Sequence, residues 1–274
     1  MTSDNSVFQW DTSRPLVMGI LNVTPDSFSD GGRFLSVEQA VARAREMVTE
    51  GADIIDIGGE STRPGAPAVS SDEELRRVLP VVGELKDLAV SVDTTKAVVA
   101  ERALAAGARI VNDISALRHD AGMLKVVRDF GAGVVLMHMQ GTPATMQQNP
   151  RYADVVGEVR EFLTERIQFA VDGGIKKPKI AVDPGLGFGK TVEHNLQLLA
   201  GLEKFVTLGC PILVGASRKS FVGKLLNREP HGRLPGSLAV AAWAVMQGAQ
   251  IVRVHDVAET VDVVRIIETL RCAS

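Results

Sequence analysis

The chain has 274 residues, 45% of them hydrophobic and 23% charged, which is the composition of an ordinary globular protein. A net charge of −3 without a basic tail argues against a nucleic-acid partner. The N-terminus lacks the apolar core of a secretory signal, and no apolar run reaches the ~18 residues that a membrane span needs. Two cysteines provide no disulfide framework. We therefore expect a cytoplasmic protein with neither a nucleic-acid nor a membrane partner.

Short apolar runs alternate with longer amphipathic stretches along the whole chain. Nearly all-apolar strands are buried on both faces, as in a parallel sheet covered by helices. Eight strand–helix units in roughly 250 residues are typical of a (β/α)8 TIM barrel, and a doubly wound open sheet is the alternative. We predict an N-terminal segment, residues 1–15, and one α/β barrel domain, residues 16–274. The expected strands are residues 16–22, 53–59, 89–94, 109–114, 133–139, 179–185, 211–217 and 250–256.

The segments between these strands have the periodicity of helices. Ser71 precedes Glu74 at the spacing of a capping box, which predicts a helix start. Gly51, Gly107 and Gly173 each follow a helical segment, and we expect them to end it in the left-handed conformation. The clearest helical segments are residues 37–51, 71–86, 153–174, 237–249 and 257–270, with a short additional helix expected within 218–236.

Every expected strand ends in polar residues. In a barrel these ends meet at one mouth, where catalytic groups lie. Residues two apart on a strand face the same way, so if Ile110 faces the barrel axis, Asn112 does too. Because unpaired charges are costly to bury, a ring of polar groups at this mouth indicates a site for a polar ligand. The polar strand ends are Asn22, Glu60 with Thr62 and Arg63, Asp93, Asn112, His138, Asp183, Lys219, and Arg253 with His255.

The hydrogen-bond acceptors in this ring suit a flat heterocycle that presents several N–H groups; they are Asp93, Asn112 and Asp183. The Asn112 amide can also donate, so it can read a mixed edge. Asp56 lies inside the second expected strand, and we predict a structural ion pair with an arginine or lysine. His138 is either a packed loop histidine or a member of the site, and both interpretations stay open.

The cationic groups in the ring suit the oxygens of a phosphate or diphosphate; they are Arg63, Lys219, Arg253 and His255. Arg253 and His255 lie on the eighth expected strand, close to where barrels often bind phosphate. Asn22 offers a neutral oxygen to Mg²⁺, which can bridge a diphosphate with one such ligand and several waters. The five histidines lack the paired spacing of a zinc site.

Residues 183–191, DPGLGFGKT, match a phosphate-binding P-loop only in part. That motif requires a glycine five residues before Gly189, and Pro184 occupies this position. The segment is therefore interpreted as a flexible turn after the sixth strand, in which the glycines and Phe188 shape a pocket wall.

Eight segments, taken in chain order over about residues 16–256, resemble the dihydropteroate synthases of folate biosynthesis. They are MGILNVTPDSFSDGG, IDIGGESTRPGA, VDT, VNDI, LMHMQGTP, DPGLGFGK, GASRKSF and RVHD. That family folds as a (β/α)8 barrel and joins 6-hydroxymethyl-7,8-dihydropterin diphosphate to p-aminobenzoate, releasing pyrophosphate with Mg²⁺ present. The resemblance implies the same transferase activity, a sulfonamide target and a homodimer.

The resemblance also implies a role for individual residues. The pterin would contact Asp93, Asn112, Ile114, Met137, Asp183 and Lys219. The diphosphate would be held by Asn22, Arg63, Arg253 and His255, with Asn22 also binding Mg²⁺. The p-aminobenzoate would lie among Phe28, Thr62, Arg63, Pro64, Phe188, Lys219 and Ser220. The catalytic residues would be Lys219, Asp93, Asp183 and Arg63.

The chemistry of these substrates favours a dissociative path. An aromatic amine is already neutral at pH 7, so the difficult step is cleavage of the C–O bond to the diphosphate. The cations would stabilise the leaving group and the carboxylates the pterin cation. Residues 24–32 are predicted to close as a lid, with Phe28 as a wall of the aminobenzoate pocket and Asp26 or Asp30 near the cation.

Two other classes of protein are weighed against this interpretation. A methyltetrahydrofolate–corrinoid methyltransferase would share the acidic and amide residues that read a pterin. It would not need Arg63 and the basic residues of RKSF and RVHD to hold a diphosphate, so their presence argues against it. A barrel that only binds its ligand is the third class, and an intact polar ring argues against that.

Overall fold

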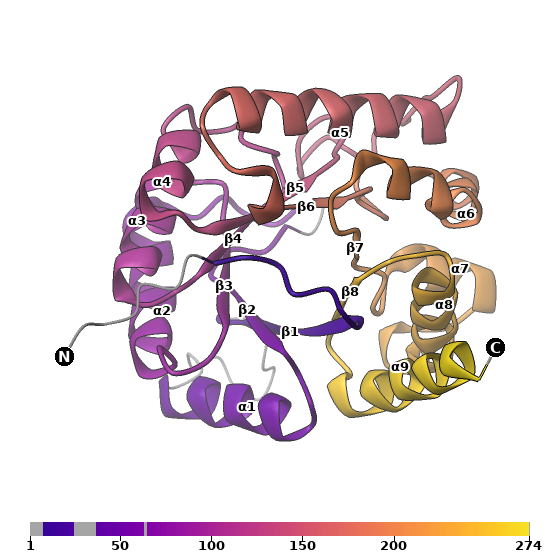
Figure 1. The fold of residues 1–274 in the computed structure, drawn as a ribbon, viewed down its shortest axis with the longest axis horizontal. Helices are drawn as coiled ribbons and strands as arrows, with labels where there is room; N and C mark the ends of the chain where they lie inside the picture. The colour runs from indigo at the N-terminus through magenta and orange to yellow at the C-terminus, as the bar shows by residue number, and fades with distance from the viewer. Residues whose placement is uncertain (1–7, 25–36, 63–64, 274) are drawn as a thin grey trace.

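The computed structural model describes residues 8–24, 37–62 and 65–273, and within them the chain forms a single barrel (Figure 1). Eight parallel strands lie in the order β6-β5-β4-β3-β2-β1-β8-β7. The two ends of this sheet meet, because Val182 forms a bridge to Ile212. The predicted (β/α)8 barrel is therefore confirmed, and the open sheet is excluded. The strands are β1 (Leu16–Asn22), β2 (Ile54–Gly58), β3 (Val90–Asp93), β4 (Ile110–Asp113), β5 (Gly133–Met137), β6 (Ile180–Asp183), β7 (Leu213–Val214) and β8 (Ile251–Val254).

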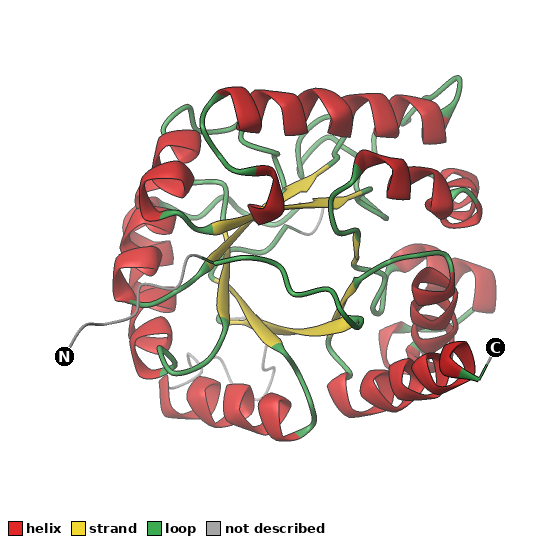
Figure 2. Cartoon of the chain, in the orientation of Figure 1, coloured by secondary structure: helices red, strands yellow, loops and turns green. Residues whose placement is uncertain are grey.

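The helices surround the strands on the outside, as Figure 2 shows. Within the described residues, α7 is the short additional helix expected between the seventh strand and the next long helix. None of the described helices is both long and apolar enough to cross a membrane. The α-helices are α1 (Val37–Thr49), α2 (Ser71–Glu84), α3 (Ala97–Ala106), α4 (Met123–Phe130), α5 (Val155–Asp172), α6 (Val192–Ala200), α7 (Ser220–Leu226), α8 (Leu234–Met246) and α9 (Val257–Cys272); the 3-10 helices are η1 (Lys177–Lys179), η2 (Leu202–Leu208) and η3 (Pro230–Gly232).

Two helix ends differ from the prediction by one residue. Ser70, and not Ser71, caps α2, because its side chain accepts a hydrogen bond from the Glu73 N–H at 3.3 Å. A capping residue must stand just outside the helix to reach these N–H groups, and Ser71 is already inside it. After α5, Gly174 has the positive φ of +94°, whereas Gly173 has a φ of −75°. Gly51 and Gly107 have positive φ values, as expected.

The interior of the barrel is filled by one apolar residue from most strands, and several of these residues lie two positions before a polar residue at the mouth. Ile110 precedes Asn112, Ala181 precedes Asp183, and Ile251 precedes Arg253 in this way. Because side chains two positions apart on a strand face the same way, a layer of polar side chains lies above the apolar layer on these strands. The interior cluster consists of Met18, Ile54, Ile110, Val135, Ala181, Leu213 and Ile251, together with Trp10.

The segment before β1 closes the end of the barrel opposite the mouth. In Figure 1 this indigo segment crosses the near end of the strands. Trp10 is 6% exposed, and its Nε1 donates to the Lys179 carbonyl at 3.0 Å. Phe8 packs edge-on against Trp10, with ring centroids 5.1 Å apart, and lies over Gly133, where an added Cβ would be 2.3 Å from the Phe8 ring. Residues 8–15 thus contribute to the barrel core.

Candidate active site

Four consecutive strands end at the same level of the mouth, and three of them end in a polar side chain. The register pairs Asn22 with Gly58, Gly58 with Asp93, and Asp93 with Asn112. Gly58 has no side chain, and a Cβ there would lie 3.6 Å from Asn22 Oδ1 and 3.6 Å from the Asp93 Cβ. The glycine therefore keeps the space between Asn22 and Asp93 open to a ligand.

Arg253 joins β8 to the acidic side of the mouth. Its Nε donates to Asp56 Oδ2 at 2.6 Å, and its Nη2 donates to Asp93 Oδ2 at 2.7 Å. The predicted ion pair of Asp56 is confirmed, and its partner is a residue that the sequence assigned to the diphosphate. Burial lowers the pKa of Arg253, but Asp56 and Asp93 outweigh it and raise the pKa above its ordinary value. The guanidinium therefore stays charged.

Asp56 also orients Asn112, a role that the sequence did not reveal. Its Oδ2 accepts from Asn112 Nδ2 at 2.9 Å, and the Asp56 side chain is fully buried. Because Nδ2 is the atom held by Asp56, Oδ1 is the acceptor that Asn112 retains for a ligand. The only signal in the sequence was a carboxylate inside an apolar strand.

Asp183 and Lys219 form a second charged region, on the side of β6 and β7. Asp183 Oδ1 accepts from the Gly185 N–H at 2.7 Å, yet burial raises the pKa of Asp183. Burial lowers the pKa of Lys219 to about 8, against the opposing effect of Asp183. The Lys219 Nζ lies 4.0 Å from the centre of the Phe188 ring. Asp183 is buried and Lys219 is half-buried. A ligand that pairs with these charges or forms hydrogen bonds to them would reduce the cost of removing them from water.

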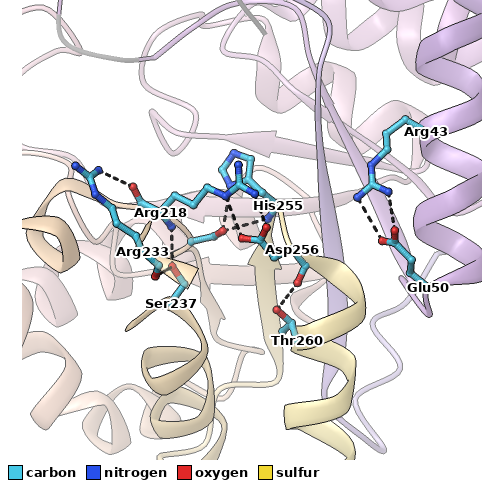
Figure 3. Close-up of polar contacts among 9 residues, drawn as sticks. Arg43, Glu50, Arg218, Arg233, Ser237, His255, Asp256 and Thr260 are labelled. Carbon is cyan, nitrogen blue, oxygen red and sulfur yellow. Dashed lines mark hydrogen bonds and ion pairs between the residues drawn. The ribbon is translucent and has the colours of Figure 1, made fainter. Parts of the chain in front are cut away.

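The turn after β7 is held by contacts of Arg218, the residue before Lys219 (Figure 3). Arg218 has a φ of +57° and forms an ion pair with Asp256. Its N–H donates to Ser237 Oγ at 2.9 Å, and its carbonyl accepts from Arg233 Nη1 at 3.0 Å. Both the N–H and the carbonyl of Arg218 are therefore held in place. The next residue, Lys219, occupies the N-cap position of α7.

His255 is held by Ser217. The Ser217 Oγ accepts from the His255 main-chain N–H at 3.1 Å and lies 3.0 Å from Nδ1. Burial, followed by the charge of Arg253, lowers the pKa of His255 to about 4, so the ring is neutral at pH 7. The Ser217 hydroxyl can donate its own proton to Nδ1, an arrangement that leaves the proton of His255 on Nε2. Such a ring can donate one hydrogen bond to an anionic oxygen.

An apolar wall completes one side of the mouth. It is formed by Ile114, Met137, Met139 and Met146, with Phe188 packed against them. The sequence assigned Ile114, Met137 and Phe188 to the site. Met139 was missed, although it is two residues after Met137 and so could be expected to face the same way.

The turn from Asp183 to Lys190 is fixed on both sides. The Gly187 N–H donates to Asn195 Oδ1 at 2.7 Å, and the Gly187 carbonyl accepts from Gln147 Nε2 at 2.6 Å. The Gly189 carbonyl accepts from the Tyr152 hydroxyl at 2.9 Å. These hydrogen bonds hold the turn at two of its glycines, and Gly185, Gly187 and Gly189 have positive φ values that favour glycine. The flexibility expected from the sequence stays a prediction.

Three predicted site residues, Phe28, Arg63 and Pro64, lie outside the described residues, as does almost all of the predicted lid. Thr62 is half-buried at the edge of the described chain, and Ser220 is exposed at the start of α7. His138 is buried, with its ring 4.8 Å from that of Phe162 and its Nδ1 2.9 Å from the Lys190 Nζ. Of its two open interpretations, these contacts favour the packed loop histidine.

The donor atoms at the mouth suit a particular kind of metal ion. Among the described residues, no group of three or more His, Cys, Asp or Glu side chains could hold a metal on its own. Mg²⁺ prefers oxygen ligands and keeps several waters when it binds substrate phosphates, so Asn22 Oδ1 would be suitable as one protein ligand beside a diphosphate. The residues therefore fit Mg²⁺ that binds together with a diphosphate.

The ionisation of Asp93 predicts how stability depends on pH in the absence of ligands. Burial, which outweighs the charge of Arg253, raises the pKa of Asp93 from 3.8 to about 7. The unfolded chain therefore releases this proton at lower pH than the folded one, so the contribution of Asp93 is present at acidic pH and is lost as pH rises from about 4 through about 7. As pH rises from 5 to 7.5, we expect the unfolding free energy of Asp93→Asn to fall by less than that of the wild type. Urea denaturation at each pH measures both values. Parallel pH profiles would contradict this assignment.

Comparison with known proteins places this site in a family. The family described as pterin binding enzyme matches residues 18–255. The dihydropteroate synthase of Escherichia coli K12 is 52% identical over 261 residues, which cover 94% of this chain and 92% of that protein. A crystal structure of Yersinia pestis dihydropteroate synthase with a sulfonamide drug complex is 51% identical, with a TM-score of 0.93, covering 97% of this chain and 98% of that one. The Xanthomonas albilineans enzyme with 4-aminobenzoic acid is 51% identical, with a TM-score of 0.89, covering 95% and 94%.

A barrel with this polar mouth, matched over nearly its whole length, is a pterin-binding enzyme. Its identity to curated relatives makes the assignment narrower. The chain belongs to the dihydropteroate synthase family, whose members are transferases.

Proposed function

We propose that this enzyme condenses 6-hydroxymethyl-7,8-dihydropterin diphosphate with p-aminobenzoate to give 7,8-dihydropteroate and pyrophosphate, a step of folate biosynthesis. The observation that supports this most is the convergence at one mouth of buried acceptors for a heterocycle and of cations for a diphosphate. Asp93 and Asn112 represent the first kind, and Arg253 and His255 the second.

The pterin occupies the deep, acidic side of the mouth in this proposal. Asp183 and Asp93 accept from its N–H groups, and Asn112 adds the oxygen that Asp56 leaves available. Ile114 and Met137 contact its faces. The three polar side chains are mostly buried, so ligand N–H groups replace solvation that folding removed.

The diphosphate lies toward β1 and β8. Arg253 and the Nε2–H of His255 bind its oxygens, with Arg63 assigned from the family resemblance. Arg253 must exchange part of its contact with Asp56 and Asp93 for the diphosphate, and Asp93 is then available to the pterin. Asn22 would hold Mg²⁺, which supplies positive charge to the leaving oxygens.

The p-aminobenzoate lies at the outer edge of the mouth, between Phe188 and the start of α7. Lys219 lies against the Phe188 ring and can contact both substrates. Ser220 is exposed at the first turn of α7, where it can reach a carboxylate. Relatives have been crystallised with 4-aminobenzoic acid and with a sulfonamide drug, which supports p-aminobenzoate as a substrate and sulfonamides as inhibitors of this enzyme.

The reaction proceeds by a dissociative path. The amine of p-aminobenzoate is neutral at pH 7 and needs no strong base, so the protein acts mainly on C–O cleavage. Arg253 and His255 stabilise the departing diphosphate, and the carboxylates of Asp93 and Asp183 stabilise the positive charge on the pterin methylene. The amine then attacks, and its proton is released to solvent.

We further propose a cytoplasmic homodimer. Cys210 and Cys272 are free thiols, as is usual in a reducing compartment. Large apolar side chains are exposed on α8 and α9, which pack against each other: Trp243, Met246, Ile266 and Leu270. Such side chains on neighbouring helices suit an interface between two copies of the chain. Light scattering after gel filtration would measure the molar mass in solution and so distinguish a dimer from a monomer.

The activity is tested by pyrophosphate release. The purified enzyme with both substrates and Mg²⁺ should release pyrophosphate and form 7,8-dihydropteroate, and omission of p-aminobenzoate should abolish product formation. A sulfonamide should compete with p-aminobenzoate and not with the pterin diphosphate. Protein that is folded by circular dichroism but releases no pyrophosphate above background would refute the proposal.

A further inference from the structure

Lys190 is a buried lysine between two loops of the mouth. It is 3% exposed, and its Nζ donates to the Phe188 carbonyl at 2.9 Å and lies 2.9 Å from His138 Nδ1. No salt bridge of the described residues includes it. The sequence placed Lys190 at the end of the DPGLGFGK segment and assigned it no role, and none of the substrate contacts proposed above uses it.

The contacts of Lys190 require a neutral histidine. Burial, followed by the charge of Lys190, lowers the pKa of His138 to about 2, so Nδ1 is an acceptor. The His138 ring is held edge-on by Phe162, which prevents it from turning away. Lys190 therefore has two fixed acceptors, one on each loop. Burial lowers the pKa of Lys190 to about 7, and the charge of Asp183 opposes this effect. Burying an amine is costly unless fixed acceptors compensate it, so the two acceptors offset part of this cost.

The two loops approach each other through their main chains. A Cβ at Gly185 would lie 1.9 Å from the His138 carbonyl oxygen, and a Cβ at Gly189 would lie 2.6 Å from the Gln140 carbonyl oxygen. This contact fixes Gly185 and Gly189, and the Phe188 N–H donates to the Gly185 carbonyl at 3.1 Å. The Phe188 carbonyl is left to be held by another group. Within the described chain, the hydrogen bond from Lys190 is the one made to the Phe188 carbonyl.

The orientation of the Phe188 peptide governs where its ring lies. That ring stands 4.0 Å from the Lys219 Nζ and packs against the apolar wall that includes Met137. We propose that Lys190 is a positioning residue for the aminobenzoate subsite: by tying the Phe188 carbonyl to His138, it holds the Phe188 ring against Lys219. This inference rests on the proposed function, because that function assigns the aromatic amine to Phe188.

Lys190→Met tests the proposal, because methionine keeps most of the side-chain volume and removes the donor. With the pterin diphosphate saturating, we expect KM for p-aminobenzoate to rise about tenfold, while kcat and KM for the pterin diphosphate stay within about twofold. Lys176→Met, on an exposed lysine at the opposite end of the barrel, is the matched control and should leave all three unchanged.

A double-mutant cycle with Phe188→Ala separates positioning from a general structural role. If Lys190 acts through Phe188, adding Lys190→Met to Phe188→Ala should raise KM for p-aminobenzoate by less than about twofold. An undiminished effect in that background, or an equal rise in KM for both substrates, would overturn the proposal. If Lys190→Met does not fold, the same double-mutant cycle can be measured with Lys190→Gln, which retains a donor on a shorter side chain. Wild-type protein that forms no product would contradict the proposed function, whereas normal wild-type turnover with an unaffected Lys190→Met would contradict only the role of Lys190.

Discussion

Lys219→Ala should lower kcat/KM about 10²–10³-fold, the loss typical of removing one preorganised charged donor from an active site. Lys219 lies against Phe188 and is held electrostatically by Asp183, so it can contact the pterin and the aminobenzoate together. Its loss should therefore lower kcat and raise KM for both substrates. Steady-state rates of pyrophosphate release, with each substrate varied in turn, measure these effects.

Lys176→Ala is the control for the loss of a lysine as such, since Lys176 is exposed and precedes β6 at the far end of the barrel. Lys219→Arg is the stricter comparison. It retains the charge, but a planar guanidinium does not fit against Phe188 in the same way, so we expect only partial recovery. Turnover of Lys219→Ala close to wild type would show that this side chain is misplaced in the proposed site.

Arg253→Met should destabilise the protein and weaken diphosphate binding through separable causes. It removes the cationic partner of Asp56, a carboxylate with no exposure, and breaking such a buried pair costs about 3–5 kcal/mol of unfolding free energy. It also removes a cation from the leaving group, so KM for the pterin diphosphate should rise much more than KM for p-aminobenzoate. Urea denaturation and steady-state kinetics measure the two effects independently.

A second substitution distinguishes these causes. Asp56→Asn removes the orphaned charge and keeps an acceptor for Asn112, so the double variant Arg253→Met with Asp56→Asn should recover most of the lost stability. It should recover little of the diphosphate affinity, because no cation returns. Recovery of both would mean that Arg253 supports the fold alone, and an equal change in KM for the two substrates would contradict its role at the diphosphate.

The fold could be predicted because each strand combines an apolar run with a polar end, and both features are local. The eight runs gave the barrel, and the alternation of Ile110 with Asn112 or Ala181 with Asp183 gave the mouth. Helix ends were less certain, because Ser70 and Ser71 are equally suitable caps by residue type. Only the exact end of the helix decides between them.

The contacts within the site depended on distances that the sequence does not contain. Arg253 reaches Asp56 and Asp93 because β8, β1, β2 and β3 are neighbours in the sheet and their register brings these residues to similar levels along the barrel axis. This register is a property of the folded sheet. The same holds for Lys190, whose two acceptors are 2 and 52 residues away in the chain. Phe28, Arg63 and Pro64 stay predictions, since they lie outside the described residues.

The placement of the two tryptophans has a consequence for experiments. Trp10 lies in the closed end of the barrel, away from the mouth, and Trp243 lies on the outer surface of α8, where its Nε1 donates to the Leu199 carbonyl at 2.8 Å. Both tryptophans therefore lie away from the mouth: Trp10 emission reports whether the barrel is intact, and Trp243 emission also responds to the proposed dimer interface. Unfolding of the Asp93 and Arg253 variants can be followed optically through Trp10, whereas ligand titrations require calorimetry or a labelled substrate.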